Sequence, residues 1–456
     1  MNAAALPSGL LLAFYGDDFT GSTDTMEVLT FAGLKTVLFL EDPTPERLAR
    51  FPGARAIGIA GTSRSRSPAW MDEHLPPRFE ALSRLGAPVL QYKVCSTFDS
   101  APDIGSIGKA IDLGVRFGKT RFTPIVIGAP SLRRFQAFGN LFATIDGIGY
   151  RLDRHPTMAR HPVTPMNEAD LRVHLGRQTI RRIELVDLVT IKQGAAGERL
   201  ANLSGDDIPA VLVDVLDHET LREAGRLVWE NRGEGLFTAS SSGLEYALVA
   251  YWRAAGLLPA DDASTTASPA EQIAVVSGSC SPATAAQIAW SAEHGFDLIR
   301  MDAAAVVHGK GAAEAARCAT AALDALSEGR DPLIFTADGP ADAALAAVED
   351  AAARSGLPGG EAQRRIGQAL ASVMQELLER ARLSRIAVAG GDTAGHVAGA
   401  LDLFALTALA PLAPGSPLCR AWSDRPGRSG LEVALKGGQV GSPSFFGAVR
   451  AGAPIT

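Results

Sequence analysis

Two adjacent carboxylates near the start of the chain are the first residues that could do chemistry. Asp17 and Asp18 follow the apolar run Leu10–Tyr15 and precede a helical pattern over Ser22–Ala32. In parallel α/β sheets, ligands bind beside the carboxyl ends of the strands. Paired carboxylates at such an end can accept hydrogen bonds from hydroxyls, hold a cation or act as a general base. The helix also needs one capping residue, and the hydroxyl candidates for that role are Thr20, Ser22 and Thr23.

Cationic residues follow two other apolar runs of the first half. Arg64 comes after Ala56–Ala60, and Lys93 lies near the end of Val89–Val94. Arginine binds a carboxylate through two parallel hydrogen bonds, and lysine supplies a point charge. Cations beside the paired carboxylates predict a site for a small polyhydroxylated anion. A solvated salt bridge is the alternative for either cation.

Three glycine- and serine-rich turns in the second half have the composition of a nucleotide site. Each follows an apolar run, so backbone N–H groups there could close on a phosphate. Neither a P-loop (GxxxxGKS/T) nor a Rossmann GxGxxG fingerprint occurs. One such turn could be a plain strand-to-helix connection, but three in one region favour a pocket. The predicted nucleotide-binding residues are Ser277, Ser279, Gly390, Gly391, Asp392, Thr393, Lys436, Gly437 and Gly438.

Histidines and cysteines form no recognisable metal or nucleophile motif. His155, His161 and His174 lie in or near an arginine-rich stretch that has neither HExxH nor a following cysteine pair. Zinc is therefore not expected, and contact with phosphate or carboxylate, or plain loop structure, is the interpretation we favour. Cys95 lacks a local Cys/His signature, so we interpret it as a small buried cysteine.

The elements that must position these residues alternate between strands and helices, which predicts βαβ units and parallel sheets. Residues Ala129–Gln178 interrupt the alternation and predict a long functional loop or an irregular excursion. Strands are expected at Leu10–Tyr15, Thr36–Leu40, Ala56–Ala60, Val89–Val94, Pro124–Gly128, Leu185–Ile191, Ala210–Val215, Gly235–Ala239, Ile273–Val276, Asp297–Met301, Pro332–Thr336, Arg385–Ala389 and Leu431–Leu435. Helices are expected at Ser22–Ala32, Ala69–Leu85, Ile104–Phe117, Glu219–Asn231, Leu244–Ala255, Thr284–His294 and Glu361–Arg382.

Length and charge limit the function classes. The chain has 456 residues, with 43 Lys and Arg against 50 Asp and Glu, so its formal charge is −7. This length predicts about two to three domains, and a net acidic chain is not expected to bind nucleic acid. No stretch approaches the roughly 20 apolar residues of a membrane helix. The start of the chain lacks a basic leader, and four scattered cysteines fit a reducing compartment, so we expect a cytoplasmic protein.

The motifs, taken in order, resemble the four-carbon acid sugar kinase family. The matching segments run from Gly16 to Phe446 and therefore cover essentially the whole chain. They read GDDFTGSTD, KVCSTFDS, HPVTPM, SGSCSPAT, AGGDTAGHV and ALKGGQVGSPSFF. One departure is Ala394, which stands where related sequences often have a second hydroxyl residue. This puts in doubt a side-chain role at that position, but not a backbone role.

The resemblance implies a kinase that moves the γ-phosphate of ATP, with Mg²⁺, to a hydroxyl of erythronate, threonate or an oxo-tetronate. It implies two α/β domains, each a mostly parallel sheet flanked by helices, with the active site in the interdomain cleft. A sugar-acid domain over 1–256, a linker over 257–271 and a nucleotide domain over 272–456 are expected. By the matching motifs, the resemblance implies that the sugar acid is bound by Asp17, Asp18, Arg64 and Lys93.

Phosphoryl transfer needs an anion cradle, a metal, cations and a group that takes the hydroxyl proton. We expect Asp18 to take the proton of the substrate hydroxyl and Asp17 to bind the substrate. Asp392 is the alternative base, or the residue that holds Mg²⁺. Two alternative functions remain: a kinase for a longer sugar acid, and a non-catalytic protein that binds a nucleotide or a sugar acid. The chain could also form a homo-oligomer. An NAD-dependent oxidoreductase would need GxGxxG after the first strand, where GDDFTG stands instead.

Overall fold

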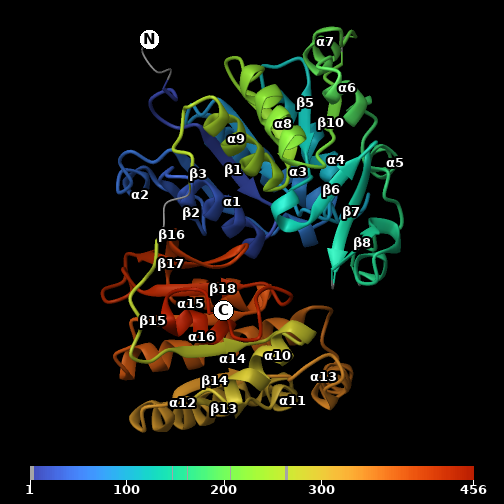
Figure 1. Ribbon diagram of the computed structural model, residues 1–456. Coiled ribbons are helices and arrows are strands. Elements are labelled where there is room, and N and C mark those ends of the chain that lie inside the picture. The colour runs from blue at the N-terminus through green and yellow to red at the C-terminus, as the bar shows by residue number, and fades with distance from the viewer. Residues whose placement is uncertain (1–4, 146, 162, 206, 262–264, 456) are drawn as a thin grey trace. The chain divides into compact units, whose positions relative to one another are not determined.

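The chain folds into two compact units. The computed structural model describes residues 5–145, 147–161, 163–205, 207–261 and 265–455. One unit is formed by residues 1–37 and 42–263, and the other by residues 38–41 and 264–456 (Figure 1). Three residues of the predicted linker, 262–264, lie outside the described residues, as does residue 162 of the HPVTPM motif.

The first unit is built on parallel strands in the order β11-β4-β1-β3-β2. Gly16 pairs with both Ala60 and Lys93, and Lys93 pairs in turn with Ser240. Four strands therefore end at the same level, and the loops that follow them share one edge of the sheet. The strands are β1 (Leu12–Gly16), β2 (Thr36–Phe39), β3 (Ala56–Ala60), β4 (Val89–Lys93) and β11 (Leu236–Ser240).

The helices of this unit begin at capping residues and bury apolar side chains against the sheet, as α3 illustrates. Ser67 accepts a hydrogen bond from Trp70 N at the start of α3, whose first residue is Pro68. Phe79 from this helix packs edge-on against Tyr15 and Phe237 in the core. The helices are α1 (Phe19–Phe31), α2 (Pro45–Leu48), α3 (Pro68–Ser83), α4 (Ile107–Gly114), α5 (Leu171–Gly176), α6 (Leu188–Lys192), α7 (Ala196–Ala201), α8 (His218–Glu230) and α9 (Gly243–Ala254).

The excursion predicted over Ala129–Gln178 is not irregular. It contains an antiparallel sheet of β6 (Arg134–Ala137), β7 (Asn140–Ile145) and β8 (Ile148–Arg151). The buried carboxylate of Asp214 accepts hydrogen bonds from Gln136 Nε2 at 3.1 Å and Gly139 N at 3.0 Å. A residue about 75 positions away in sequence thus fixes the first hairpin, and for that reason the local pattern did not reveal it.

The strand predicted over Leu185–Ile191 is also partly wrong. Strand β9 ends at Val186, because Asp187 accepts a hydrogen bond from Thr190 N at 2.7 Å and so begins α6. A parallel three-stranded sheet in the order β5-β10-β9 results. Its strands are β5 (Thr123–Val126), β9 (Ile183–Val186) and β10 (Ala210–Val213).

The second unit has a parallel sheet whose strands run β18-β15-β12-β14-β13. An antiparallel hairpin of β16 and β17 extends it, and Leu38 pairs there with Leu406. The sequence pattern did not predict either strand of this hairpin. The strands are β12 (Ala274–Ser277), β13 (Phe296–Arg300), β14 (Asp331–Phe335), β15 (Arg385–Ala389), β16 (Leu403–Ala413), β17 (Ser416–Ser423) and β18 (Glu432–Lys436).

Helices complete the second unit. Helix α14 contacts both α12 and α15, and α10 contacts α16. Their bounds are α10 (Pro282–Ala292), α11 (Ala303–Ala305), α12 (Gly311–Ser327), α13 (Ala343–Arg354), α14 (Glu361–Arg380), α15 (Gly391–Ala400) and α16 (Phe445–Ala451). The α/β class is thereby confirmed. No helix in the described part of the chain combines the length and apolar character needed to cross a bilayer.

Candidate active site

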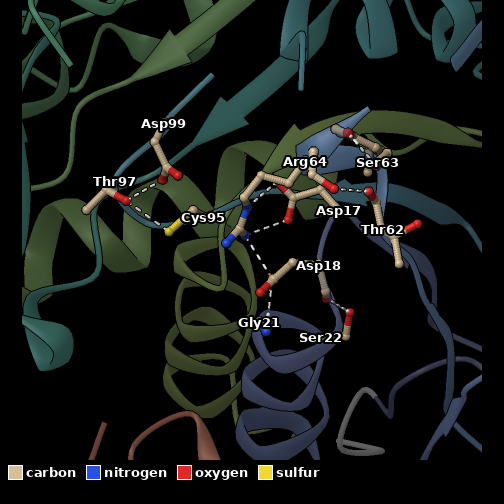
Figure 2. Close-up of polar contacts among 12 residues, drawn as sticks. Asp17, Asp18, Gly21, Ser22, Thr62, Ser63, Arg64, Cys95, Thr97 and Asp99 are labelled. Carbon is tan, nitrogen blue, oxygen red and sulfur yellow. Dashed lines mark hydrogen bonds and ion pairs between the residues drawn. The ribbon is translucent and has the colours of Figure 1, made fainter. Parts of the chain in front are cut away.

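Arg64 joins the two adjacent aspartates at the end of β1. Its Nε lies 3.1 Å from Oδ2 of Asp17, and its Nη2 lies 2.7 Å from Oδ1 of the same residue. Nη2 also donates to Oδ1 of Asp18 at 2.8 Å (Figure 2). The structure thus brings together three of the four residues predicted on the substrate side. The remaining nitrogen, Nη1, makes no hydrogen bond to any residue that the structure describes.

The backbone fixes this cluster by continuing the strand pairing beyond the strands. Asp17 N donates to Lys93 O at 2.9 Å, and Arg64 N donates to Asp17 O at 2.9 Å. The turn that carries Arg64 is a short 3₁₀ segment, Ser63–Ser65. Three residues far apart in sequence are therefore held by the sheet edge, whether or not a ligand is present.

Asp18 has a second task as the N-cap of α1. Its Oδ1 accepts a hydrogen bond from Gly21 N at 2.9 Å, and Ser22 Oγ donates to its backbone oxygen at 2.6 Å. The prediction of a hydroxyl cap at residue 20, 22 or 23 is therefore wrong. A carboxylate suits the cap better because it also neutralises Arg64 and faces the positive end of the helix.

Burial and charge act in opposite directions on these groups. Burial raises the pKa of Asp17, whose side chain is 3% exposed, and the Arg64 guanidinium counteracts this rise. Burial disfavours the charged form of Arg64, but the carboxylates of Asp17 and Asp18 raise its pKa well above the usual value. Arg64 therefore stays cationic. Asp18 is the more accessible of the two acids, with 25% of its side chain exposed.

Lys93 is the fourth predicted residue on the substrate side, and it is buried beside the cluster. It is 3% exposed, and its Nζ makes no hydrogen bond or ion pair within the described part of the chain. A Cβ on Gly21 would lie 2.8 Å from Lys93 Nζ and 2.1 Å from Oδ1 of Asp18. The glycine therefore leaves the space that the ammonium and the carboxylate occupy at the first turn of α1.

A third carboxylate, Asp99, belongs to this site and was not among the predicted residues. Thr97 Oγ1 donates to Asp99 Oδ1 at 2.6 Å, and the Cys95 thiol lies 2.9 Å from the same hydroxyl (Figure 2). Against the effect of burial, Arg64 and Thr97 hold the pKa of Asp99 below its usual value, with His161 acting in the same direction. The signal was present in KVCSTFDS, where Asp99 follows a strand end.

Burial raises the pKa of Cys95 to about 11, so this thiol is not a nucleophile at neutral pH.

Of the histidines, His155 accepts hydrogen bonds from the backbone of Thr157 and Met158. His174 Nε2 lies 3.0 Å from Ser100 Oγ. His155 therefore stabilises its own loop, whereas the contact of His174 joins helix α5 to the segment of Ser100.

The residues predicted to bind nucleotide gather at one edge of the second unit. Ser277, Ala389 and Lys436 are aligned across β12, β15 and β18, so the three turns begin at the same level. Gly278 N donates to Ala389 O at 3.1 Å, and Gly390 N donates to Lys436 O at 3.0 Å.

The glycines of these turns allow close approach. A Cβ on Gly278 would lie 2.3 Å from Thr393 Oγ1, and one on Gly438 would lie 2.9 Å from Ser279 Oγ. Gly390 has a φ of 113°, a conformation that favours glycine. The three turns thus lie close together in front of the first turn of α15, whose N–H groups have no partners within the helix.

Lys436 lies beneath this edge and is fully buried. Its Nζ donates to Thr284 Oγ1 at 3.0 Å and to Gly438 O at 3.2 Å. Burial lowers the pKa of Lys436 to about 8. Thr284 also donates to Ser279 Oγ at 2.9 Å, so the lysine links two of the three turns from below.

Asp392 lies exposed in the first turn of α15, in the second unit, whereas Asp18 belongs to the first unit. No group of three or more His, Cys, Asp or Glu side chains among the described residues could hold a metal ion. None of the four cysteines forms a disulfide bond.

Two family models match the chain. Residues 12–248 match a sugar-binding N-terminal domain, and residues 274–446 match a nucleotide-binding C-terminal domain. The chain is similar to crystal structures of a Salmonella typhimurium protein and of a Haemophilus influenzae protein, with TM-scores of 0.77 and 0.71 at 25% and 24% identity. Each match covers 96% of this chain, and 98% and 99% of the respective solved chains.

Curated relatives are similar along their whole length. A 3-oxo-isoapionate kinase of Paraburkholderia graminis is 58% identical over 99% of this chain and 96% of its own. A 3-oxo-tetronate kinase of Cupriavidus necator is 31% identical over 98% of both chains. Kinases of this kind use ATP. The chain therefore belongs to the four-carbon acid sugar kinase family and is a sugar-acid kinase.

Proposed function

We propose that this enzyme transfers the γ-phosphoryl group of ATP to a hydroxyl of a 3-oxo sugar acid. The substrate that we propose first is 3-oxo-isoapionate, and the second is a 3-oxo-tetronate. The order follows from identity, because the relative named for the first substrate is 58% identical and the one named for the second is 31% identical. Both names describe 3-oxo acids, so a carboxylate and a neighbouring carbonyl are the features that the site must recognise.

The observation that carries the proposal is the arrangement of cations in the first unit. Arg64 is held along one edge by Asp17 and Asp18, and its Nη1 has no partner among the described residues. The Nζ of Lys93 likewise has no hydrogen bond or ion pair there. We assign the substrate carboxylate to these two cations. A preorganised guanidinium and a buried ammonium lose little conformational freedom on binding it.

For the nucleotide, we propose the edge of the second unit where the three glycine-containing turns meet. Backbone N–H groups of Gly391 and Gly438 would face the phosphates, with the α15 N-terminus adding its dipole. Gly390, whose own N–H donates to Lys436 O, would shape the turn. Ser277, Ser279 and Thr393 are close enough to these glycines to supply hydroxyls. In this assignment Lys436 supports the turn of Gly437 and Gly438 and adds positive charge from below.

The residues present fit a Mg²⁺ ion that enters with ATP. Mg²⁺ in phosphoryl-transfer sites is held by one or two carboxylates plus the phosphates, so a three-carboxylate cage is not required. Asp392 is exposed beside the glycine turn and is the residue to which we assign the ion. When bound, Mg²⁺ would neutralise charge on the phosphates.

The proton of the reacting hydroxyl is assigned to Asp18. In the proposed step the hydroxyl oxygen bonds to the γ-phosphorus, the bond from that phosphorus to the β–γ bridging oxygen breaks, and ADP leaves. The proton passes to a carboxylate oxygen of Asp18, which is the accessible acid of the pair. We propose that the reaction takes place in the cytoplasm, where ATP is available.

Release of ADP, followed in a coupled assay, tests the function. The panel is 3-oxo-isoapionate, 3-oxo-tetronates, erythronate, threonate and longer oxo-acids, each with MgATP. We expect the highest kcat/KM with 3-oxo-isoapionate. A higher value with a tetronate or a longer acid would overturn the substrate assignment. ATP binding without turnover on any acid would instead support a non-catalytic binding protein.

A further inference from the structure

A buried group of polar side chains lies behind Lys93. Lys93 ends β4, and its register partners are Gly16 at the end of β1 and Ser240 at the end of β11. Helix α1 follows β1, helix α9 follows β11, and the two helices contact each other. Lys93 is therefore flanked by the starts of two helices, and these contribute Asp24, Thr25, Ser242 and Glu245.

These four side chains carry oxygen atoms without hydrogen-bond partners in the described part of the chain. They are Oδ1 of Asp24, Oγ1 of Thr25, Oγ of Ser242 and both carboxyl oxygens of Glu245. Thr25, Ser242 and Glu245 are fully buried, and Asp24 is 9% exposed. Leaving buried polar atoms unpaired is unfavourable, so such a group is expected to serve a purpose other than stability.

Charge links the group to Lys93. Burial raises the pKa of Asp24 and raises that of Glu245 to about 8, and in both cases Lys93 opposes the rise. Asp24 and Glu245 also act on each other, and Asp18 acts on Asp24. Around neutral pH, Glu245 is therefore mostly protonated and neutral.

We propose that Asp24 and Glu245 are positioning residues that act through Lys93 on sugar-acid binding. The negative charge of Asp24 holds the buried ammonium in place at the end of β4. The neutral carboxyl of Glu245 avoids a second negative charge, which would compete with the substrate carboxylate for Lys93. This inference rests on the proposed function, because it assigns the sugar acid to Lys93.

The first test compares kinetics from pH 6.5 to 9.5 for the wild type, Glu245→Gln and Asp24→Asn. In the wild type, KM for the sugar acid should rise several-fold above about pH 8, because ionised Glu245 repels the substrate. Glu245→Gln should keep KM within about twofold at pH 7 and remove the rise. Asp24→Asn should raise KM for the sugar acid about tenfold, which is the effect of one pKa unit of interaction, and leave KM for ATP unchanged.

A matched control is Trp252→Phe on the same helix, α9. Its Nε1 is also buried without a partner among the described residues, yet it is not part of this group. We expect the control to leave KM for the sugar acid and its pH profile unchanged. Thermal unfolding of every variant separates loss of folding from loss of binding.

A second test needs no turnover. Calorimetric titration with the sugar acid at pH 8, in two buffers of different ionisation enthalpy, measures protons taken up on binding. Because the bound anion favours neutral Glu245, the wild type should take up a fraction of a proton that Glu245→Gln does not. Equal proton uptake, or an unaltered pH profile in Glu245→Gln, would overturn the inference. An inactive wild type that binds no 3-oxo acid would instead overturn the proposed function.

Discussion

Arg64 binds Asp17 side-on, with Nε 3.1 Å from Oδ2 and Nη2 2.7 Å from Oδ1 of the carboxylate. In this geometry one edge of the planar guanidinium, Nε and Nη2, binds the carboxylate, and the third nitrogen, Nη1, points away from Asp17. A carboxylate that is 3% exposed cannot itself contact much of a substrate, so its main contribution is to orient the arginine. In our proposal, the pair is a preorganised receptor for the carboxylate of the sugar acid.

Arg64→Lys should therefore weaken sugar-acid binding although it keeps the charge. A lysine cannot reproduce two parallel hydrogen bonds to Asp17, and losing a charge-assisted hydrogen bond costs about 1.5–3 kcal/mol. We expect kcat/KM for the sugar acid to fall by about 10- to 100-fold, with KM for ATP unchanged. Steady-state kinetics with each substrate varied in turn measures both. Arg66→Lys, an exposed position in the same loop, is the control and should change neither constant.

Gly21→Ala should damage the same site by crowding. The added Cβ would lie 2.1 Å from Oδ1 of Asp18 and 2.8 Å from Lys93 Nζ, and both distances are shorter than real Cβ contacts. Both groups must move, so we expect KM for the sugar acid to rise at least about tenfold, since even a one-ångström misplacement is costly. Gly197→Ala in α7 adds a Cβ whose nearest neighbour is 3.8 Å away, and it should leave the kinetics unchanged. Equal effects of both variants would contradict this reasoning.

The edges that carry both candidate sites could be predicted from the sequence, because strand ends and residue types are local signals. The contact of Arg64 with Asp17 spans 47 positions, yet it follows from two parallel strands ending at one level. The hairpin of β6 and β7 could not be predicted in the same way. Its turn depends on Asp214, a residue far along the chain.

Burial was the harder property to anticipate. Lys436 was predicted as a nucleotide contact, but nothing in KGGQVG indicates that its ammonium lies beneath the turn on Thr284. Glu245 lies in LEYALVAYW, and a single acidic residue among apolar ones indicates that its side chain is buried. Asp99 was not predicted, because only the fold shows that Arg64 acts on it.

Cys280 should be the fast-reacting thiol of this protein. It is exposed in the turn between Ser279 and Ser281, whereas burial raises the pKa of Cys95 and of Cys318 to about 11 and Cys419 is buried. Titration with a chromogenic disulfide at pH 8 should show one fast phase, which Cys280→Ser removes. If the proposed nucleotide edge is correct, MgATP slows this phase and the sugar acid alone does not. Protection by the sugar acid alone would argue against the assignment.

Lys436 should make stability depend on pH. Burial lowers its pKa to about 8 from a usual value near 10.5, so between these values the folded state binds fewer protons than the unfolded state. The free energy of unfolding therefore rises with pH across this window, by up to about 1.4 kcal/mol per pH unit. Urea unfolding at several pH values measures the slope. Lys436→Met should reduce the slope by this contribution, and an unchanged slope would show that the lysine titrates normally.

The choice between Asp18 and Asp392 as the base depends on which step each variant impairs. Asp18→Asn keeps an oxygen that can cap α1 but cannot take a proton, so kcat should fall by roughly 10²- to 10⁴-fold. Asp392→Asn, in contrast, should chiefly raise the Mg²⁺ concentration needed for half-maximal rate, because that acid is assigned to the metal. Rates at saturating sugar acid and ATP, with Mg²⁺ varied, separate the two effects. If Asp18→Asn keeps a near-normal kcat while Asp392→Asn loses it at saturating Mg²⁺, the proton goes to Asp392 and our assignment is reversed.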